Sequence, residues 1–467
     1  MDNREAIQHL IKLGQLPTAE LVRELTSPGR LTGGEELYAL QPSEKRVKIE
    51  EKGSSVEILQ QFQWKPKKVK VDDFVAYFRN RYNHIKNILI NRQETEGAIS
   101  ISKLSAMSGK TTIVAIVTDI QKLPTGTLKI TLEDLTGKIT AIASMKKEDL
   151  VPKLSFIAPD EVLAFKGSAG KGVFFIDDII WPDIPAHNRP LSPDEAYAVF
   201  TGDIHSGSNM FLPKEFSKFI EWLKGDYGDA QMKDMAKKTK YVFVMGDLID
   251  GVGIYPEQEK ELSVKDASRQ YELLASYLKE IPDDKHIIII PGNHDSVGLE
   301  EPQVVIPKQY GEALYNLPNV MMVSNPASIK IHKHAEYAGF DVLMYHGYSF
   351  DHFVDTVEAL RLAGGYDAPD KIWEFLLKRR HLAPTYGATL ALPMDPDPLA
   401  IRQIPDMVAS GHIHKAKIGQ YRGVLSASCS CWQSRTNFQV RVGHKPEPAI
   451  IPVYGLHNGK AMMMEFI

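Results

Sequence analysis

Five short motifs contain the residues of this chain whose types and spacing could support catalysis. Each holds aspartate, asparagine or histidine, and none contains cysteine. Oxygen ligands from aspartate and asparagine suit Mn²⁺ or Mg²⁺, whereas neutral imidazole suits Zn²⁺, Fe²⁺ or Mn²⁺. A mixed set of this kind predicts a catalytic site for a pair of divalent metal ions. In chain order the motifs are Asp203-Ile-His205, Gly246-Asp247-Leu-Ile-Asp250, Gly292-Asn293-His294-Asp295, Tyr345-His346-Gly347 and Gly411-His412-Ile-His414.

Each motif is a weak signal alone, because Gly-Asp and Gly-Asn-His are common turns and His-x-His is often two surface histidines. Their positions give them weight, since every motif follows a short apolar run typical of a buried strand. In open α/β sheets, ligands bind outside the carboxyl ends of the strands, so five such loops can converge on one pocket. The apolar runs are residues 196–200, 241–245, 286–290, 341–344 and 406–409.

The order of these motifs resembles the calcineurin-like metallophosphoesterase superfamily, whose pattern is DxH, GDxxD, GNH(D/E), H and GHxH. The resemblance runs from about residue 196 to the C-terminus, and every metal-ligand position of the pattern is occupied. It implies one metal held by Asp203, His205 and His414. It implies a second metal held by Asn293, His346 and His412, with Asp247 bridging both.

The same resemblance assigns roles to three further side chains. His294 would face the scissile phosphate without ligating metal, and Asp250 and Asp295 would orient histidines by hydrogen bonds. Two metals clamp a phosphate and produce a hydroxide nucleophile at neutral pH, so phosphoester hydrolysis is implied. His294 would stabilise the developing charge or protonate the leaving oxygen. Manganese is the expected metal, and the ligand set also admits iron or zinc.

The composition is that of a soluble globular protein large enough for two or three domains. The net charge of −4 provides no global basic surface, so local patches or a partner would have to hold any nucleic acid. No apolar stretch approaches the ~20 residues of a membrane span, and no membrane association is expected. Cys429 and Cys431 are expected to be buried free thiols in a reducing cytoplasm, although a zinc site with ligands from elsewhere is an alternative.

The first 98 residues precede the motifs and divide into three segments. Residues 1–26 carry two short helical patterns, which predict either a small helical module or a docking site for a partner. Residues 27–70 contain Gly, Pro and charged runs and are expected to form a flexible linker. Residues 71–98 are expected to form a helix that leads into the next domain, with Asp72 as its cap and an apolar face for core packing.

Residues 99–185 show five short alternating strands with glycine-containing turns, which predict a small closed barrel of the OB-fold type. Such barrels bind single-stranded nucleic acid when aromatic and basic residues line one face. The aromatic residues here are few, so a barrel that docks protein is at least as compatible. The fold class is therefore expected to be α/β and multidomain, with an OB-fold barrel followed by a calcineurin-like αββα sandwich over residues 190–467.

This layout, together with segments 376–387 and 431–439 and the helix before the barrel, resembles the small subunits of archaeal family D DNA polymerases. The resemblance implies a 3′→5′ exonuclease that removes mispaired primer ends as nucleoside 5′-monophosphates and also has a scaffolding role. Its implied partners are a large polymerising subunit and a DNA primer–template, with a sliding clamp as a further candidate. The substrate-contact candidates, which would otherwise be a solvated helix end, are Arg379, Arg380 and His381.

Two other functions remain open from the sequence. One is a phosphoesterase acting on nucleotides or phosphoproteins, against which the barrel and the late Trp432-Gln…Phe438-Gln segment argue. The other is a structural polymerase subunit with weak catalysis, against which the complete ligand set argues. Trp432 itself could stack on a nucleobase, but a place at the edge of the core is the simpler expectation.

Overall fold

The computed structural model describes residues 38–42, 48–51, 54–66, 68–106, 109–170, 172–334, 337–441 and 443–467. Residues 64–183 and 378–401 belong to one compact unit, and residues 42–63, 184–377 and 402–467 belong to another. The helical patterns predicted over residues 1–26 lie outside the described residues. No described helix is long and apolar enough to cross a membrane.

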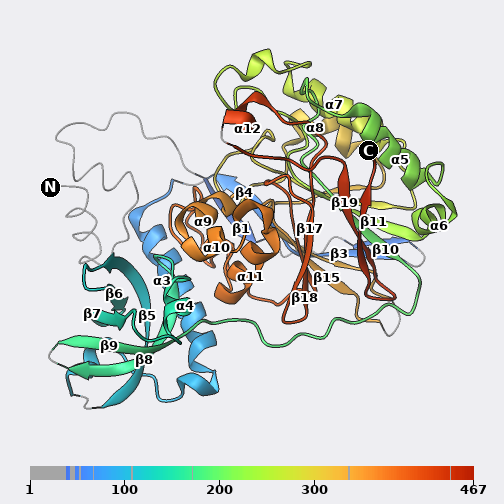
Figure 1. The fold of residues 1–467 in the computed structure, drawn as a ribbon. Coiled ribbons are helices and arrows are strands. Elements are labelled where there is room, and N and C mark those ends of the chain that lie inside the picture. The colour runs from blue at the N-terminus through green and yellow to red at the C-terminus, as the bar shows by residue number, and fades with distance from the viewer. Residues whose placement is uncertain are drawn as a thin grey trace. The chain divides into compact units, whose positions relative to one another are not determined.

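The first unit contains a closed five-stranded barrel (Figure 1). The strands follow the order β5-β6-β7-β9-β8, in which only β7 and β9 pair in parallel. Alternate side chains such as Ile113, Ile130 and Phe165 are fully buried in its interior. The predicted five-stranded barrel is confirmed, whereas its identity as an OB-fold stays a prediction. Its elements are β5 (Lys110–Lys122), β6 (Thr127–Asp134), β7 (Gly137–Ser144), α4 (Val151–Leu154), β8 (Val162–Gly170) and β9 (Val173–Ile180).

Helix α3 (Val71–Ile90) lies against the barrel through its apolar face. Tyr82 and its neighbours one and two turns later pack on strands β5 and β8, and the Tyr82 hydroxyl donates to the Val114 carbonyl oxygen at 3.1 Å. The helix was expected to be capped by Asp72, but the Asp73 carboxylate receives the Lys70 backbone N–H at 2.7 Å. The predicted helix is present over residues 71–90, which is shorter than the expected 71–98, and Asp73 rather than Asp72 makes the contact at its start.

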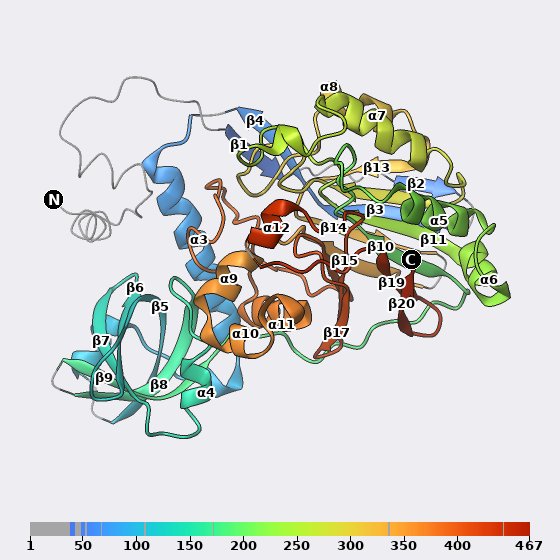
Figure 2. The ribbon, with the colours of Figure 1, turned by 45° about the horizontal axis from the view of Figure 1, so that its top comes forward.

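The second unit is built on two sheets (Figures 1 and 2). In the first sheet, β10 to β13 are parallel neighbours and β19 and β20 extend the edge as antiparallel strands. Its strands, in spatial order, are β13 (Val320–Met322), β12 (His286–Ile290), β11 (Thr239–Met245), β10 (Tyr197–Thr201), β19 (Ile450–Gly455) and β20 (Ala461–Glu465). The second sheet holds β17 (Lys417–Tyr421), β18 (Val424–Ser428), β16 (Met407–Ser410), β15 (Phe340–Met344), β14 (Ala327–Ile331), β3 (Ser54–Gln60) and β2 (Lys48–Glu51).

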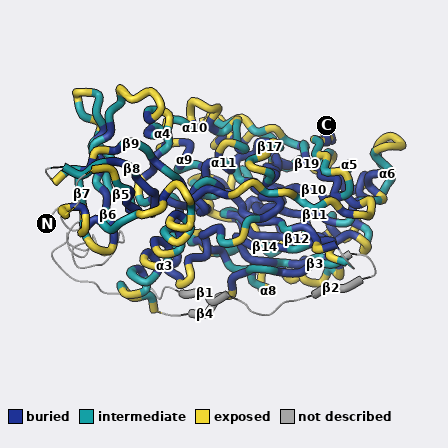
Figure 3. Tube along the Cα trace, turned by 90° about the horizontal axis from the view of Figure 1, so that it is seen from below, coloured by how far each residue is buried: buried dark blue, intermediate teal, exposed yellow. Residues whose placement is uncertain are grey.

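The two sheets share one apolar core, which accounts for the nearly continuous apolar runs of their central strands. Phe243 and Ile288 from the first sheet pack in the same cluster as Ile329 and Val342 from the second. Figure 3 shows β11 and β12 of the first sheet as buried along nearly their whole length. A strand buried on both faces has little freedom to slip, so its carboxyl end is a firm base for a functional loop.

Helices cover the outer face of each sheet in the second unit. The outer face of the first sheet packs in one cluster with α5, α6, α7 and α8, where Phe216 and Leu274 are fully buried. On the second sheet, Trp373 of α11 donates its indole N–H to the Ser410 hydroxyl at 3.0 Å. The helices are α5 (Pro213–Lys224), α6 (Ala230–Lys238), α7 (Ala267–Leu278), α8 (Lys308–Tyr315), α9 (Phe350–Thr356), α10 (Glu358–Leu362), α11 (Pro369–Arg379) and α12 (Asn437–Arg441).

The flexible linker expected over residues 27–70 is wrong for residues 38–42, 48–51, 54–60 and 62–66, which form strands. Strand β3 pairs antiparallel with β14 of the second sheet, and β4 (Phe62–Pro66) pairs with β1 (Tyr38–Pro42). Val56 and Ile58 alternate along β3, and both side chains are buried in the core between the sheets. This short alternation was hidden by the surrounding charged and glycine-rich sequence.

Candidate metal centre

The five apolar runs form strands, and each predicted ligand lies within four residues of a strand end. Strands β10, β11 and β12 are parallel neighbours, as are β15 and β16, so within each sheet the motif loops leave from the same edge. The loops supply Asp203 and His205 after β10, Asp247 after β11, Asn293 after β12, His346 after β15, and His412 and His414 after β16. All of these residues belong to the second unit.

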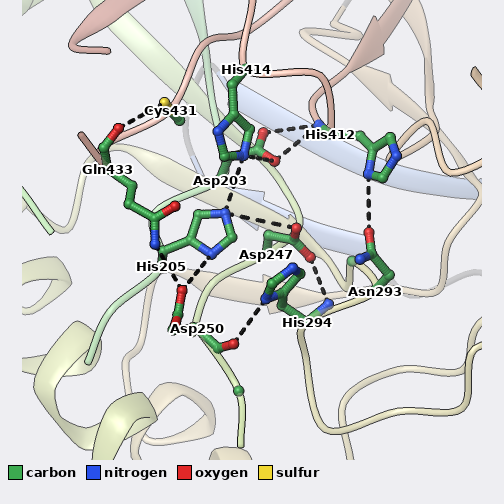
Figure 4. A network of polar contacts seen from close by, with 12 residues as sticks. Asp203, His205, Asp247, Asp250, Asn293, His294, His412, His414, Cys431 and Gln433 are labelled. Atoms are coloured by element: carbon green, nitrogen blue, oxygen red, sulfur yellow. Dashed lines mark hydrogen bonds and ion pairs between the residues drawn. The ribbon is translucent and has the colours of Figure 1, made fainter. Parts of the chain in front are cut away.

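One half of the cluster, here called site A, consists of Asp203, His205 and His414 (Figure 4). The Nε2 atoms of His205 and His414 are 3.1 Å apart, and Asp203 Oδ1 lies 3.4 Å from His414 Nε2. All three side chains are buried. Two imidazole nitrogens and a carboxylate oxygen therefore point at one small volume.

The other half, site B, consists of Asn293, His346 and His412. Asn293 Oδ1 lies 3.0 Å from both His346 Nε2 and His412 Nδ1. Asp247 stands between the two sites, because its Oδ1 is 3.5 Å from His346 Nε2 while its Oδ2 is 3.9 Å from His205 Nε2. One carboxylate with an oxygen toward each site is the arrangement that a bridging ligand requires.

The four histidines each have their outer ring nitrogen held by a partner. His205 Nδ1 meets Asp250 Oδ1 at 3.1 Å, and His346 Nδ1 meets the Met245 carbonyl oxygen at 2.7 Å. His412 Nε2 meets Asp351 Oδ2 at 2.9 Å, and His414 Nδ1 meets the side-chain amide of Gln439 at 3.0 Å. An oxygen acceptor on the outer nitrogen of His205, His346 and His412 fixes the ring and leaves the inner nitrogen free for an ion, as in metal-binding histidines, whereas Gln439 presents its amide nitrogen to His414. The donor set therefore fits two divalent cations.

The electrostatics of the cluster favour cations. Burial alone would raise the pKa of Asp247, but His346 and His294 beside it hold that pKa well below its usual range. Burial would lower the pKa of His346, but the Asp247 carboxylate raises it to about 10. A buried carboxylate that draws protons onto neighbouring imidazoles would also attract a divalent ion.

The backbone is strained at the ligands themselves. Among the described non-glycine residues with positive φ are Asp203, His205, Asp247, His412 and His414, with φ between 47° and 71°. Such conformations concentrate at functional sites, where the surrounding structure enforces them. The motif glycines leave room for the carboxylates: a β-carbon at position 292 would lie 2.2 Å from Asp247 Oδ1, and one at position 411 would lie 2.3 Å from Asp203 Oδ2.

His294 lies beside the bridging Asp247, and its Nδ1 is held by a backbone carbonyl oxygen, as that of His346 is. Its backbone N–H donates to Asp247 Oδ1 at 2.8 Å, and its ring Nδ1 meets the Asp250 carbonyl oxygen at 2.8 Å. Its ring packs edge-on against His205, with centroids 4.8 Å apart, and burial lowers its pKa. That His294 approaches the site without being a ligand stays a prediction.

Comparisons with known proteins agree with this geometry. The calcineurin-like phosphoesterase family matches residues 197–416. The DNA polymerase II small subunit of Archaeoglobus fulgidus is 38% identical over 386 residues, which cover 82% of this chain and 75% of that protein. The protein of the same name from Methanothermobacter thermautotrophicus is 36% identical over 399 residues, covering 85% of this chain and 80% of its own length.

The chain belongs to the archaeal DNA polymerase II small-subunit family. The Pyrococcus abyssi member is 34% identical over 437 residues, which cover 90% of this chain and 69% of that protein. Among solved structures, asparaginyl-tRNA synthetase from Pyrococcus horikoshii is 12% identical and matches 17% of this chain and 21% of its own at a TM-score of 0.16. That likeness supports no conclusion.

The structure contradicts the prediction that three basic residues of this chain contact the substrate. Arg379, Arg380 and His381 are buried within the first unit, each with a protein partner. Arg379 Nε pairs with Glu161 Oε2 at 2.7 Å, Arg380 Nε donates to the Ile401 carbonyl oxygen at 2.9 Å, and His381 Nε2 meets Asp397 Oδ2 at 2.9 Å. Buried cations need such partners, so these side chains stabilise the fold of the first unit and are not available to bind a phosphate.

Asp295 also differs from its expected role of orienting a histidine. Its Oδ2 receives the backbone N–H of Gly292 at 2.8 Å, and its Oδ1 receives the Tyr271 hydroxyl at 3.0 Å. Burial, together with the nearby Asp247, raises the pKa of Asp295 to about 7. Asp295 therefore fixes the loop that carries Asn293 and His294, whereas Asp250 contacts His205 as expected.

Sequence reasoning missed three side chains that support the cluster. Asp351 and Gln439 hold His412 and His414, and Gln433 donates to Asp250 Oδ1 at 2.8 Å. Gln433 and Gln439 fall in the segment 431–439 that carried the family resemblance, which was the available signal for them. Trp432 in the same segment is in the core, where its indole N–H donates to the Thr201 hydroxyl at 2.7 Å. The two cysteines are buried and free, as expected.

Proposed function

We propose that this chain is the 3′→5′ proofreading exonuclease and a scaffolding small subunit of a two-subunit archaeal DNA polymerase. The observation that carries the proposal is Asp247, which directs one oxygen toward site A and the other toward site B. A subunit retained only as scaffold would have no need to keep strained, buried ligands at both sites. The family name of the relatives supplies the polymerase context.

The residues divide the work of hydrolysis between binding and positioning. Asp203, His205 and His414 would hold one divalent ion, Asn293, His346 and His412 would hold the other, and Asp247 would be shared. When bound, such a pair supplies Lewis-acid stabilisation of phosphoryl oxygens and a hydroxide nucleophile at neutral pH. Manganese is the proposed metal, with iron or zinc as alternatives.

His294 is the proposed catalytic side chain. The Asp250 carbonyl oxygen fixes its Nδ1, which leaves Nε2 as the ring atom available to a substrate phosphate. From there His294 would stabilise charge on the phosphoryl oxygens or give a proton to the departing 3′ oxygen. Cleavage of the 3′-terminal phosphodiester in this way releases a nucleoside 5′-monophosphate.

The proposed partners are a large polymerising subunit and the 3′ end of a primer–template. The net charge of −4 makes this chain a poor binder of DNA by itself, so the partner would deliver the strand. The barrel has the strand number expected of an OB-fold. We propose docking to protein for it at least as readily as binding to DNA, because Phe165 and Phe174 are buried in its core and Phe175 is exposed. A sliding clamp is a further candidate for the N-terminal patterns.

Digestion of an end-labelled primer–template with a 3′ mismatch tests this proposal. The chain is assayed with Mn²⁺, alone and with the large subunit, and compared with His294→Ala and Asp247→Ala. We expect stepwise loss of 3′ nucleotides, retained metal without hydrolysis in His294→Ala, and metal loss in Asp247→Ala. Absence of hydrolysis with both metals present would favour the scaffold, and activity only on small phosphomonoesters would favour a phosphatase.

A further inference from the structure

A second cluster of potential ligands lies elsewhere in the second unit, apart from sites A and B. It consists of Asp194, His332 and His334, whose ligand atoms lie within 4.8 Å of one another. Asp194 precedes β10 by three residues, and His332 directly follows β14. The cluster therefore lies where the chain enters strand β10 of the first sheet and where it leaves strand β14 of the second sheet.

The distances in this cluster suit a small ion with few ligands. Asp194 Oδ2 lies 2.9 Å from His334 Nε2 and 4.0 Å from His332 Nε2. Ligands about 2.0–2.1 Å from a tetrahedral zinc ion are about 3.3 Å from one another, which lies within this range. Two imidazoles and one carboxylate are a common zinc ligand set, with the fourth position open to water.

His332 carries the strongest evidence. Its side chain is 3% exposed, and its Nε2 is buried without a hydrogen-bond partner in the part of the chain that the structure describes. Asp194 Oδ2 at 4.0 Å is beyond hydrogen-bond distance. A buried imidazole nitrogen left unpaired is costly, and a metal ion between His332 and Asp194 would remove that cost.

The surroundings hold His332 in the orientation that a ligand needs. Its other ring nitrogen, Nδ1, meets the hydroxyl of the buried Tyr241 at 3.0 Å, which fixes the ring and directs Nε2 toward Asp194. Its backbone N–H donates to the Ser55 carbonyl oxygen on β3 at 2.9 Å. With φ at +60°, His332 also has the strained backbone seen at the ligands of sites A and B.

We propose that Asp194, His332 and His334 form a third metal site, which takes Zn²⁺ through these three side chains and a water molecule. The ion clips the segment leading into β10 to the end of β14. Strand β10 ends just before Asp203, so the ion fixes the start of the strand whose other end leads to the Asp203 and His205 ligands of site A. The third metal site does not depend on the proposed nuclease activity, and it is tested by metal content rather than by hydrolysis.

The experiment measures zinc bound to the metal-stripped full-length chain after titration with Zn²⁺ and removal of free ion. His334→Gln and Asp194→Asn are compared with the wild type and with His457→Gln. His457 is the matched control, because its ring contacts the carbonyl oxygen of Ala196, two residues after Asp194, at 3.4 Å without belonging to the cluster. His334 and Asp194 are partly exposed, so their polar substitutions are compatible with folding.

The expected result is one zinc ion fewer per chain in His334→Gln and Asp194→Asn, with zinc affinity at the third site weakened at least about 100-fold. His457→Gln keeps the wild-type content. Titration with Co²⁺ gives a second readout, since a tetrahedral ion absorbs visible light strongly and this absorption should fall in the two variants. Equal zinc content in all four proteins, or a third ion held only at millimolar zinc, would show adventitious binding and overturn the proposal.

Discussion

Asp250 and Asp351 allow sites A and B to be weakened separately. Asp250 holds His205 of site A, and Asp351 holds His412 of site B, each through a carboxylate oxygen on the outer ring nitrogen. Asp250→Asn and Asp351→Asn keep the size of the side chain but replace the charge. We expect each substitution to lower manganese affinity at its own site and to leave the other site near its wild-type affinity.

The structure predicts different magnitudes for the two variants. Loss of such an outer contact weakens metal binding by about 10–100-fold, or about 1.4–2.7 kcal/mol. The Asp250 side chain is 1% exposed, so water has little access to replace it. The Asp351 side chain is 50% exposed, so water can take over the hydrogen bond to His412. We expect about 100-fold for Asp250→Asn and about 10-fold for Asp351→Asn.

Isothermal titration of the metal-stripped chain with Mn²⁺ measures both affinities, and nuclease rate against manganese concentration gives an independent readout. Asp355→Asn is the matched control for site B, because Asp355 lies on the same helix, α9, and is exposed. Equal weakening of both sites by each variant would show that the sites act as one unit. Unchanged affinities would show that these carboxylates do not orient ligands, and either result would refute the reasoning.

Three further predictions concern the loop at Gly292 and the first unit. Gly292→Ala places a β-carbon 2.2 Å from Asp247 Oδ1, and the displaced carboxylate should cost about 100-fold in nuclease rate, measured at saturating Mn²⁺. Arg81→Met leaves the buried Asp397 carboxylate, 2.7 Å from Arg81 Nε, without its arginine, and should destabilise the unit by about 3–5 kcal/mol in urea unfolding. Burial raises the pKa of Asp160 to about 6, so ionisation of this carboxyl group lowers the folding stability as the pH rises from about 4 to about 6. In thermal unfolding, Asp160→Asn should therefore be more stable than the wild type at pH 8 and equal to it below pH 4.

The clustering of the candidate ligands was predictable, because every one of them follows a strand of the same two sheets. Each lies just after an apolar run, and parallel strands bring such positions to one edge. Asp203 and His412 could be found from two motifs more than two hundred residues apart, without any knowledge of their contact. The hydrogen bond from the His412 backbone N–H to Asp203 Oδ1, at 2.9 Å, is what the motif spacing could not show.

The supporting layer was less predictable because its members follow no such rule. Asp351 comes from a helix after β15, and no spacing relates it to His412. Arg379 and His381 look like a basic patch in sequence, and only their pairing with buried carboxylates of the same unit shows otherwise. Charge alone does not distinguish a cation that meets a substrate from one that satisfies a buried carboxylate.

Backbone strain adds evidence that the motifs alone could not supply. A left-handed conformation at a non-glycine residue costs about 1–3 kcal/mol, and it persists only where neighbouring contacts enforce it. Two backbone hydrogen bonds enforce this conformation at Asp203. Its N–H donates to the Gly246 carbonyl oxygen at 2.9 Å, and its carbonyl oxygen accepts the backbone N–H of Trp432 at 2.9 Å. Trp432 is anchored in turn by the core, so packing far from the metals sets the direction of a ligand. The apolar core therefore supports the candidate metal centre, and Trp432, which was expected at the edge of the core, lies within it and positions Asp203.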